Sequence, residues 1–402
     1  MAGRIGPILA ALAALVVTAC SAPAAPAAVP GGAGTASATP TVQSSRSGTP
    51  ELRVSTVAAG LDQVWDVGFL PDGRMLVTER GGRLVLLSGT AEGATVAPVA
   101  ADFGDLLVRG EGGLMGLVVH PDFAQSRRFT TCQTHTEGGR PVDIRLVTWT
   151  LSADGARAER VVDPLVGGLP VNPSGRHSGC RPTLAADGAL LVGTGDTARG
   201  NLPQDLGSLG GKALRADLAT GRPAPGNPID GSLVYTYGHR NVQGVAVRPS
   251  DGAVYTAEHG PTTDDEVNLL RPGGNYGWDP GQGGTVGGYD ESVPMTDLER
   301  FPDAVAAAWS SGSPVEAVAG AAFVSGPQWG DLDGTLAVAA LRGSKLLLMT
   351  IGADGAVTSV AEPGPLDGTF GRLRAVRTGP DGALFVSTSN GDDDRVLRID
   401  PV

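Results

Sequence analysis

The sequence predicts an all-β protein, a six-bladed β-propeller with four-stranded antiparallel blades over residues 51–402. Glycine is frequent, at 61 of 402 residues, and helical periodicity is weak, as expected of a chain made of short strands and many turns. A β-like run, an aspartate-centred turn and a second β-like run also recur six times, with the aspartates near positions 72, 122, 187, 251, 333 and 381.

Each of the six repeats predicts one blade of the propeller. In chain order they read VWDVGFLPDGRMLVTE, GLMGLVVHPDFAQSRRFTTC, RPTLAADGALLVGTGD, VQGVAVRPSDGAVYTAE, AAFVSGPQWGDLDGTLAVAAL and LRAVRTGPDGALFVSTS. One such unit cannot bury both faces of its sheet, whereas neighbouring blades can cover each other. A ring of six is therefore favoured over the alternative, a pair of β-sandwiches. Loops at one end of a propeller usually build its site, so we expect the functional residues between the repeats.

The N-terminus is predicted to be an address for export. Residues 1–19 form a signal peptide, in which Arg4 precedes the apolar run IGPILAALAALVV, too short to span a bilayer. The small residues before Cys20 resemble a bacterial lipobox, which implies a lipid anchor on the Cys20 sulfur; the alternative is a plain secretory signal with an incidental cysteine. Residues 20–50 are rich in Ala, Pro, Ser, Thr and Gly and predict a disordered tether. The protein is thus expected outside the cytoplasm, held to the membrane by the lipid alone.

The charge of the chain bears on its partners. A net charge of −12 makes nucleic acid a poor partner, because phosphate binding needs a basic face. Lys212 and Lys345 are the only lysines, so the cations are nearly all arginine, which suits carboxylate ligands. The alternative cause of this bias is codon usage.

The remaining cysteines, Cys132 and Cys180, predict a disulfide, since two thiols in an exported protein usually pair. The alternative is two separate buried thiols.

The most unusual stretch is EHGPTTDDEVNLLRPGGNYGW, residues 258–278. Four carboxylates and a histidine fall close together in a chain with only 18% charged residues and five histidines. Such a stretch is either a solvated loop or a cation site. Other candidate groups lie in GEGGLMGLVVHPDF, GRHSGC, GTGD, YGHRNVQG, LAVAALRGSKLLLM and GRLRAVRTGPDG.

In this order, these segments resemble the soluble sugar dehydrogenases that depend on pyrroloquinoline quinone, the glucose/sorbosone dehydrogenase family. The aldose sugar dehydrogenase branch is the closer match, and the resemblance covers roughly residues 52–400, with YGHRNVQG and residues 258–278 as its most specific motifs. It implies a six-bladed propeller that oxidises the anomeric hydroxyl of aldose sugars to lactones, with pyrroloquinoline quinone and calcium as cofactors. The electron acceptor is not identified.

The resemblance implies three catalytic residues. His177 matches the family's general base, and an imidazole can take a proton at neutral pH. Asp196 matches an aspartate that orients this base. Arg240, with Asn241, matches residues near the reactive quinone carbonyl, where a cation stabilises developing negative charge. Taken alone, His177 would be interpreted as a structural histidine.

Further residues are implied to bind the quinone, a flat trianion. Arg342, Arg372 and Arg374 match contacts to it; without the resemblance, the last two would be interpreted as solvent-exposed residues of one strand face. His259 is implied to lie against the cofactor. Glu111 belongs to this cofactor set and stands where the family usually has a glutamine beside the substrate.

The resemblance also implies metal ligands. Backbone carbonyls matching Gly260 and Pro261 bind calcium at the quinone, and the ion acts as a Lewis acid. Glu266 and Tyr276 match a second, structural calcium site, whose remaining ligands do not align clearly.

Two departures leave other functions open. Glu111 would repel an anionic cofactor, and PVEAVAGAAF replaces a stretch that seats the cofactor in relatives, which favours a non-catalytic envelope propeller that binds a glycan or a protein. Arg176 replaces an aspartate of the glucose dehydrogenases and weakens any claim for glucose. A third alternative is a calcium-dependent lactonase on a similar propeller. Such an enzyme would hold its metal with several side-chain carboxylates.

Overall fold

The structure, a computed structural model, describes residues 48–281 and 288–402. The predicted signal peptide, Cys20 and residues 20–47 of the predicted tether lie outside the described residues. In the described part, no helix has the length and apolar character needed to cross a membrane.

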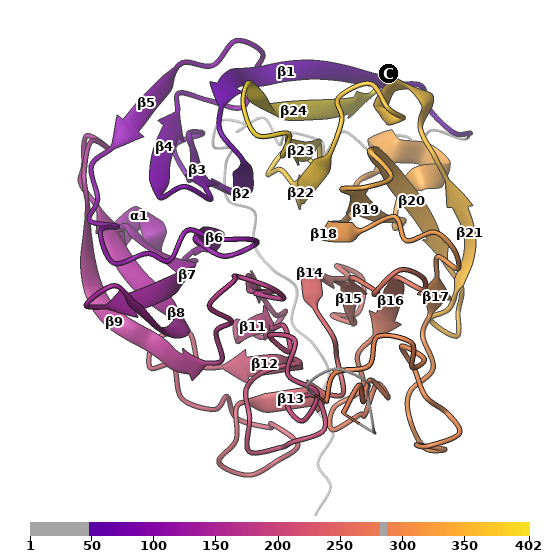
Figure 1. Ribbon diagram of the computed structural model, residues 1–402. Helices are drawn as coiled ribbons and strands as arrows, with labels where there is room; N and C mark the ends of the chain where they lie inside the picture. The colour runs from indigo at the N-terminus through magenta and orange to yellow at the C-terminus, as the bar shows by residue number, and fades with distance from the viewer. Residues whose placement is uncertain (1–47, 282–287) are drawn as a thin grey trace, which may run out of the picture. The chain divides into compact units, whose positions relative to one another are not determined.

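Six four-stranded antiparallel sheets form a six-bladed β-propeller, which confirms the predicted fold and rules out a pair of sandwiches (Figure 1). Five blades each use four consecutive strands, and the innermost is named first: β2 (Val64–Phe69), β3 (Met75–Glu79), β4 (Arg83–Leu87), β5 (Val96–Val99); β6 (Leu114–Val119), β7 (Arg128–Glu137), β8 (Arg140–Leu151), β9 (Ala158–Leu169); β10 (Arg181–Leu184), β11 (Leu190–Gly193), β12 (Lys212–Ala216), β13 (Val234–Tyr237); β14 (Val242–Val247), β15 (Val254–Glu258), β16 (Glu266–Leu269), β17 (Trp309–Ser310); β18 (Val318–Phe323), β19 (Leu336–Ala340), β20 (Lys345–Ile351), β21 (Val357–Ala361).

The last blade closes the ring with both ends of the described body. It consists of β22 (Leu373–Thr378), β23 (Leu384–Thr388), β24 (Asp394–Pro401) and, on its outer edge, β1 (Leu52–Leu61). Leu52 lies opposite Pro401 in an antiparallel register. The helical elements described are short: α1 (Phe123–Ser126), η1 (Pro327–Leu332) and η2 (Gly364–Leu366).

The six turn aspartates all lie between the first and second strands of their blades. In several of them the side chain accepts a hydrogen bond from the amide two residues on, as Asp187 does from Ala189 at 3.1 Å and Asp251 from Ala253 at 3.0 Å. An aspartate that bonds its own turn in this way favours a tight hairpin. These six turns therefore share one end of the propeller.

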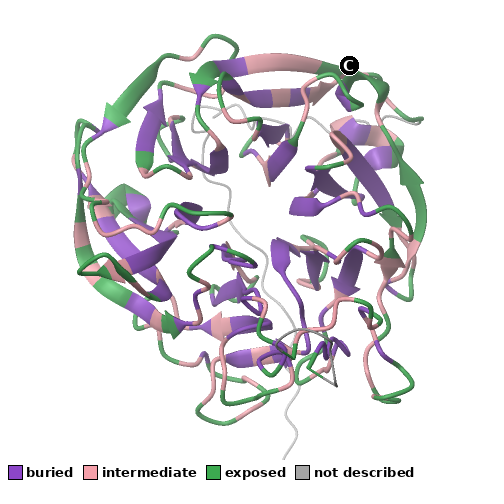
Figure 2. Cartoon of the chain, in the orientation of Figure 1, coloured by how far each residue is buried: buried purple, intermediate pink, exposed green. Residues whose placement is uncertain are grey.

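Apolar residues between adjacent sheets form the core. One cluster joins Val67 and Val77 of the first blade to Phe385 of the last. The inner strands are mostly buried, whereas the outer strands β5, β9 and β21 carry more exposed residues (Figure 2).

The predicted disulfide is confirmed. Cys132 in β7 is bonded to Cys180, just before β10, and their Cα atoms lie 6.1 Å apart. The bond ties one blade to the segment that enters the next, and this segment carries His177 only three positions upstream.

Candidate functional site

Most of the predicted site residues lie at the end of the propeller opposite the aspartate turns. In an antiparallel blade, the start of the first strand and the end of the second lie at the same end of the sheet. Glu111, His177 and Arg240 precede first strands, and Asp196 and His259 follow second strands. Their contacts, described next, show that residues far apart in the sequence meet here.

His177 and Asp196 form a buried pair. The Nδ1 atom of His177 lies 2.7 Å from the Oδ1 atom of Asp196, and the two residues are 4% and 0% exposed. Because a carboxylate accepts hydrogen bonds, this contact favours the tautomer with the proton on Nδ1. The Nε2 atom is then an acceptor, and the Nε atom of Arg176 lies 3.3 Å from it.

Close approach of two backbone segments holds this pair in place. His177 has a φ of +50°, and a Cβ atom on Gly195 would collide with the His177 carbonyl. Gly179, with a φ of +55°, packs against the same segment and donates its N–H to the Asn241 Oδ1 atom at 3.1 Å. The glycines of GRHSGC and GTGD therefore let the base and its aspartate come together.

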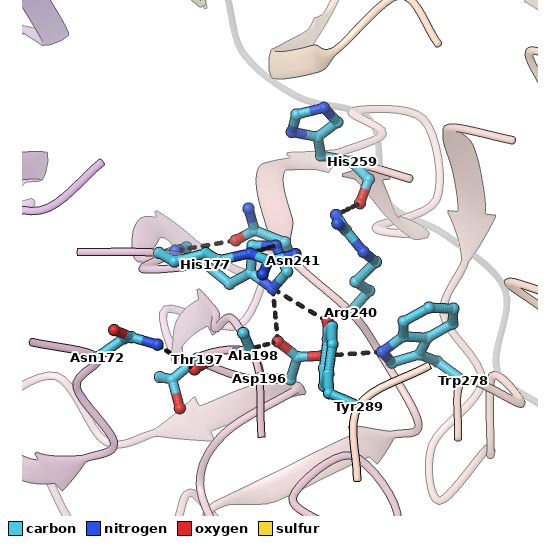
Figure 3. Close-up of polar contacts among 12 residues, drawn as sticks. Asn172, His177, Asp196, Thr197, Ala198, Arg240, Asn241, His259, Trp278 and Tyr289 are labelled. Carbon is cyan, nitrogen blue, oxygen red and sulfur yellow. Dashed lines mark hydrogen bonds and ion pairs between the residues drawn. The ribbon is translucent and has the colours of Figure 1, made fainter. Parts of the chain in front are cut away.

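Sequence reasoning missed two donors to Asp196. The Nε1 atom of Trp278 and the hydroxyl of Tyr289 each donate to the Asp196 Oδ2 atom at 2.8 Å, and the Tyr289 hydroxyl lies 3.2 Å from the His177 Nδ1 atom (Figure 3). Trp278 ends the unusual stretch 258–278 and is one of only five tryptophans, a signal that could have drawn attention to it. Tyr289 lies in a segment without a recognisable pattern.

Glu111 is engaged by the protein itself. Its carboxylate accepts hydrogen bonds from the backbone N–H of His177 (3.1 Å) and Ser178 (3.3 Å) and from the side chains of Asn241 (3.0 Å) and Gln243 (2.8 Å). Burial opposes ionisation, but the nearby His177 and the Asn241 hydrogen bond lower the pKa of Glu111. The carboxylate therefore anchors the base-bearing segment, and its charge is compensated locally.

Arg240 lies beside the His177–Asp196 pair, and its side chain is 4% exposed. Its Nη1 atom donates to the His259 carbonyl at 2.7 Å, its Nη2 atom lies 2.6 Å from a carboxylate oxygen of Glu291, and its guanidinium lies over the Trp278 ring. Glu291 is a third residue that sequence reasoning missed. Burial and the nearby Arg240 lower the pKa of His259 to about 4, so its ring is neutral at pH 7.

The other predicted arginines differ in exposure. Arg374 is 8% exposed, and burial lowers its pKa to about 10, so it is still charged at pH 7. Its Nη1 atom is buried and has no hydrogen-bond partner among the described residues. Arg342 and Arg372 are exposed. The alternative of two solvent-facing residues therefore fails for Arg374 and holds for Arg372.

The predicted calcium carbonyls lie in a tight loop after β15. The N–H of Gly260 donates to the Asp265 Oδ1 atom at 2.8 Å. No backbone N–H in residues 48–281 and 288–402 donates to the carbonyl of Gly260 or Pro261. These oxygens are the kind of ligand that calcium takes.

The residues predicted for a second ion have other partners. Glu266 accepts hydrogen bonds from Thr296 at 2.8 Å and Asn268 at 3.2 Å, and burial together with Glu258 raises its pKa to about 8. The hydroxyl of Tyr276 donates to the Leu269 carbonyl at 2.7 Å. The part of the chain that the structure describes holds no group of three or more His, Cys, Asp or Glu residues arranged for a metal.

Comparison with known proteins identifies relatives along most of the chain. The family model for glucose/sorbosone dehydrogenase matches residues 61–398. The aldose sugar dehydrogenase YliI of Escherichia coli K12 is 29% identical over 359 residues, which cover 87% of this chain and 93% of that protein.

Solved structures agree in fold. The PQQ-bound aldose sugar dehydrogenase of Streptomyces coelicolor is 30% identical with a TM-score of 0.71, and the match covers 88% of this chain and 99% of that one. A glucose dehydrogenase-type oxidoreductase of Thermus thermophilus is 38% identical with a TM-score of 0.70, and the match covers 87% and 99% of the two chains.

Proposed function

This chain belongs to the glucose/sorbosone dehydrogenase family and is a sugar dehydrogenase dependent on pyrroloquinoline quinone, and we propose that it oxidises the anomeric hydroxyl of aldoses to lactones with His177 as general base. The observation that carries this proposal is the buried His177–Asp196 pair beside the cation of Arg240. Oxidation of an alcohol removes a proton from oxygen and a hydride from carbon, and this arrangement supplies a proton acceptor next to a positive charge.

His177 would take the proton at its Nε2 atom, where the substrate hydroxyl would replace the contact from the Arg176 Nε atom. The Nδ1 atom already bonds Asp196, and the negative carboxylate stabilises the imidazolium that forms. The Trp278 and Tyr289 donors hold the Asp196 carboxylate in position during this transfer.

The residues present fit an anionic quinone. The Nη1 atom of Arg374 and the Nε atom of Arg240 are buried donors without a partner among the described residues, and such donors suit carboxylate and carbonyl oxygens. We propose that Arg240, Asn241, His259, Arg342, Arg372 and Arg374 hold the cofactor, with Glu111 acting through the backbone of His177. When bound, the quinone supplies the two-electron acceptor for the hydride.

A calcium ion fits the loop after β15. The carbonyls of Gly260 and Pro261 are free of backbone donors among the described residues, and we propose them as its ligands. Such an ion supplies Lewis-acid polarisation of the quinone. The second ion at Glu266 and Tyr276 stays a prediction, and both side chains already have protein partners.

The alternatives gain no support. Glu111, which favoured a non-catalytic glycan- or protein-binding propeller, is compensated by four hydrogen-bond donors and need not repel a cofactor. A lactonase needs a carboxylate-rich metal site, and no group of three or more acidic, His or Cys ligands occurs within residues 48–281 and 288–402.

Reconstitution tests the proposal. The protein is loaded with pyrroloquinoline quinone and calcium, and dye reduction is measured with a panel of aldoses. We expect turnover by the wild type and its loss in His177→Ala with quinone binding retained. His135→Gln, a change on another blade, is the matched control. Absence of quinone binding by the wild type would refute the dehydrogenase proposal, and full activity of His177→Ala would refute its role as base.

The cellular location is a separate proposal. We propose that export and a lipid on Cys20 hold the protein outside the cytoplasm, with residues 20–50 as a tether. A Cys20→Ser variant should then be released from the membrane fraction, and an unchanged distribution would contradict the anchor.

A further inference from the structure

Glu291 places a carboxylate between two guanidinium groups at the candidate base. One oxygen lies 2.6 Å from the Nη2 atom of Arg176, and the other lies 2.6 Å from the Nη2 atom of Arg240. The Nε atom of Arg176 also lies 3.3 Å from the Nε2 atom of His177. The space between the two arginines is thus shaped for a carboxylate and lies next to the proposed proton acceptor.

Further contacts with the protein hold both guanidinium groups in place. Arg240 donates to the His259 carbonyl at 2.7 Å and lies over the Trp278 ring, and Arg176 lies over the ring of Tyr289 with 5.4 Å to its centroid. The planar fork of arginine matches the two oxygens of a carboxylate, so a fixed pair of such forks recognises this group with defined geometry.

The Glu291 side chain is open to solvent, so another carboxylate can reach its position. Its side chain is 37% exposed, and residues 288–308 contain no strand or helix to hold it. Burial opposes its ionisation, but hydrogen bonds from Arg240 and Arg176 lower the pKa of Glu291, so it is an anion at neutral pH. If its side chain turned outward, two neighbouring guanidinium groups would lose their carboxylate partner, and this favours a negatively charged ligand.

We propose that Arg176 and Arg240 form a subsite for the carboxylate group of a ligand, which takes the place of Glu291. Two sources share this chemistry: an aldose that bears an acid group, such as a hexuronic acid, and the quinone cofactor with its three carboxylates. The assignment of either source to this subsite rests on the proposed function, whereas the subsite rests on the contacts of Arg176, Arg240 and Glu291.

Binding to the cofactor-free full chain tests the subsite. Quenching of tryptophan fluorescence, with Trp278 as the nearby reporter, gives Kd values for D-glucuronate, D-glucose and pyrroloquinoline quinone. Glu291→Gln removes the internal competitor and should lower the Kd of at least one carboxylate probe about tenfold, while that of glucose stays unchanged. Arg176→Gln should raise the same Kd by a similar factor. Glu299→Gln, at an exposed position of the same segment, is the matched control.

The results distinguish a carboxylate of the substrate from one of the cofactor. They also distinguish failure of the subsite from failure of the proposed function. Tighter binding of glucuronate alone assigns the subsite to the substrate, and tighter binding of the quinone alone assigns it to the cofactor. The subsite is refuted if neither carboxylate probe binds better to Glu291→Gln, or if glucose gains as much as glucuronate. A wild type that fails to turn over any aldose after reconstitution, with glucuronate still tightened by Glu291→Gln, would count against the proposed function and leave the subsite standing.

Discussion

The Nδ1 atom of His177 lies 2.7 Å from the Oδ1 atom of Asp196, and the structure buries both side chains. This hydrogen bond occupies Nδ1 and leaves the Nε2 atom of the imidazole as the nitrogen that can accept a proton. The orientation is set by a carboxylate that has three further donors, from the Ala198 N–H, Trp278 and Tyr289.

Asp196→Asn should abolish most turnover. An asparagine can present its amide group to Nδ1, and the proton would then sit on Nε2, where it blocks proton acceptance. We expect kcat of the reconstituted enzyme to fall by about 10²- to 10⁴-fold, with the Kd for the quinone little changed. Asp205→Asn, at an exposed position, is the control. A kcat within a factor of two of the wild type would show that Asp196 does not orient the base.

Tyr289→Phe should reduce turnover by a smaller factor. The change removes one donor to Asp196 and leaves the ring that packs near Trp278. The Asp196 carboxylate would then be held less firmly against the base, so we expect about a tenfold lower kcat. Tyr235→Phe is the control, and a kcat of Tyr289→Phe within a factor of two of the wild type would show that this donor does not position Asp196.

Asp66→Asn should destabilise the propeller. Asp66 in β2 accepts from Arg377 of β22 at 2.9 and 2.6 Å and lies 3.0 Å from Arg181 of β10, so it joins the inner strands of three blades. Removal of one partner from a buried ion pair predicts a loss of about 3 to 5 kcal/mol in the free energy of unfolding, measured by urea denaturation at pH 7. Asp303→Asn, at an exposed position, should cost little.

The same carboxylate predicts a pH dependence. Burial opposes ionisation of Asp66, but Arg377 and Arg181 outweigh it and lower its pKa. The unfolded chain then takes up the proton first on acidification, so this contribution is complete above pH ~4 and is lost as the pH falls further. Asp66→Asn should flatten the decline of stability at acidic pH; an equally steep decline in the variant would contradict this assignment.

Loss of the Cys132–Cys180 disulfide should weaken the fold. The bond closes a loop with a sequence separation of 48 residues, and its removal predicts a loss of about 2 to 4 kcal/mol. Wild-type protein with reductant and the double Cys132→Ala, Cys180→Ala variant should unfold at similar, lower denaturant concentrations. Reductant should not change the double variant. Equal stability of the oxidised and reduced wild type would contradict a stabilising role.

The blades could be predicted from local sequence because each repeats the same short-range pattern. An aspartate turn between two β-like runs, as at Asp187 and Asp251, needs only neighbouring residues to form, and six copies indicate a closed ring. The alternation of residues along a strand did not predict which side chains are exposed. Arg372 and Arg374 occupy alternate positions, yet the first is exposed and the second buried.

The sequence by itself determined the architecture, the paired cysteines and, through its motifs, the candidate base and its aspartate. Only the tertiary structure decided what surrounds them. Tyr289 and Glu291 come from an irregular segment about a hundred residues beyond His177, and Glu111 lies well before it, so no local period connects them. Such contacts arise when blades close into a ring and bring their loops to one end, a long-range event that local propensity does not encode.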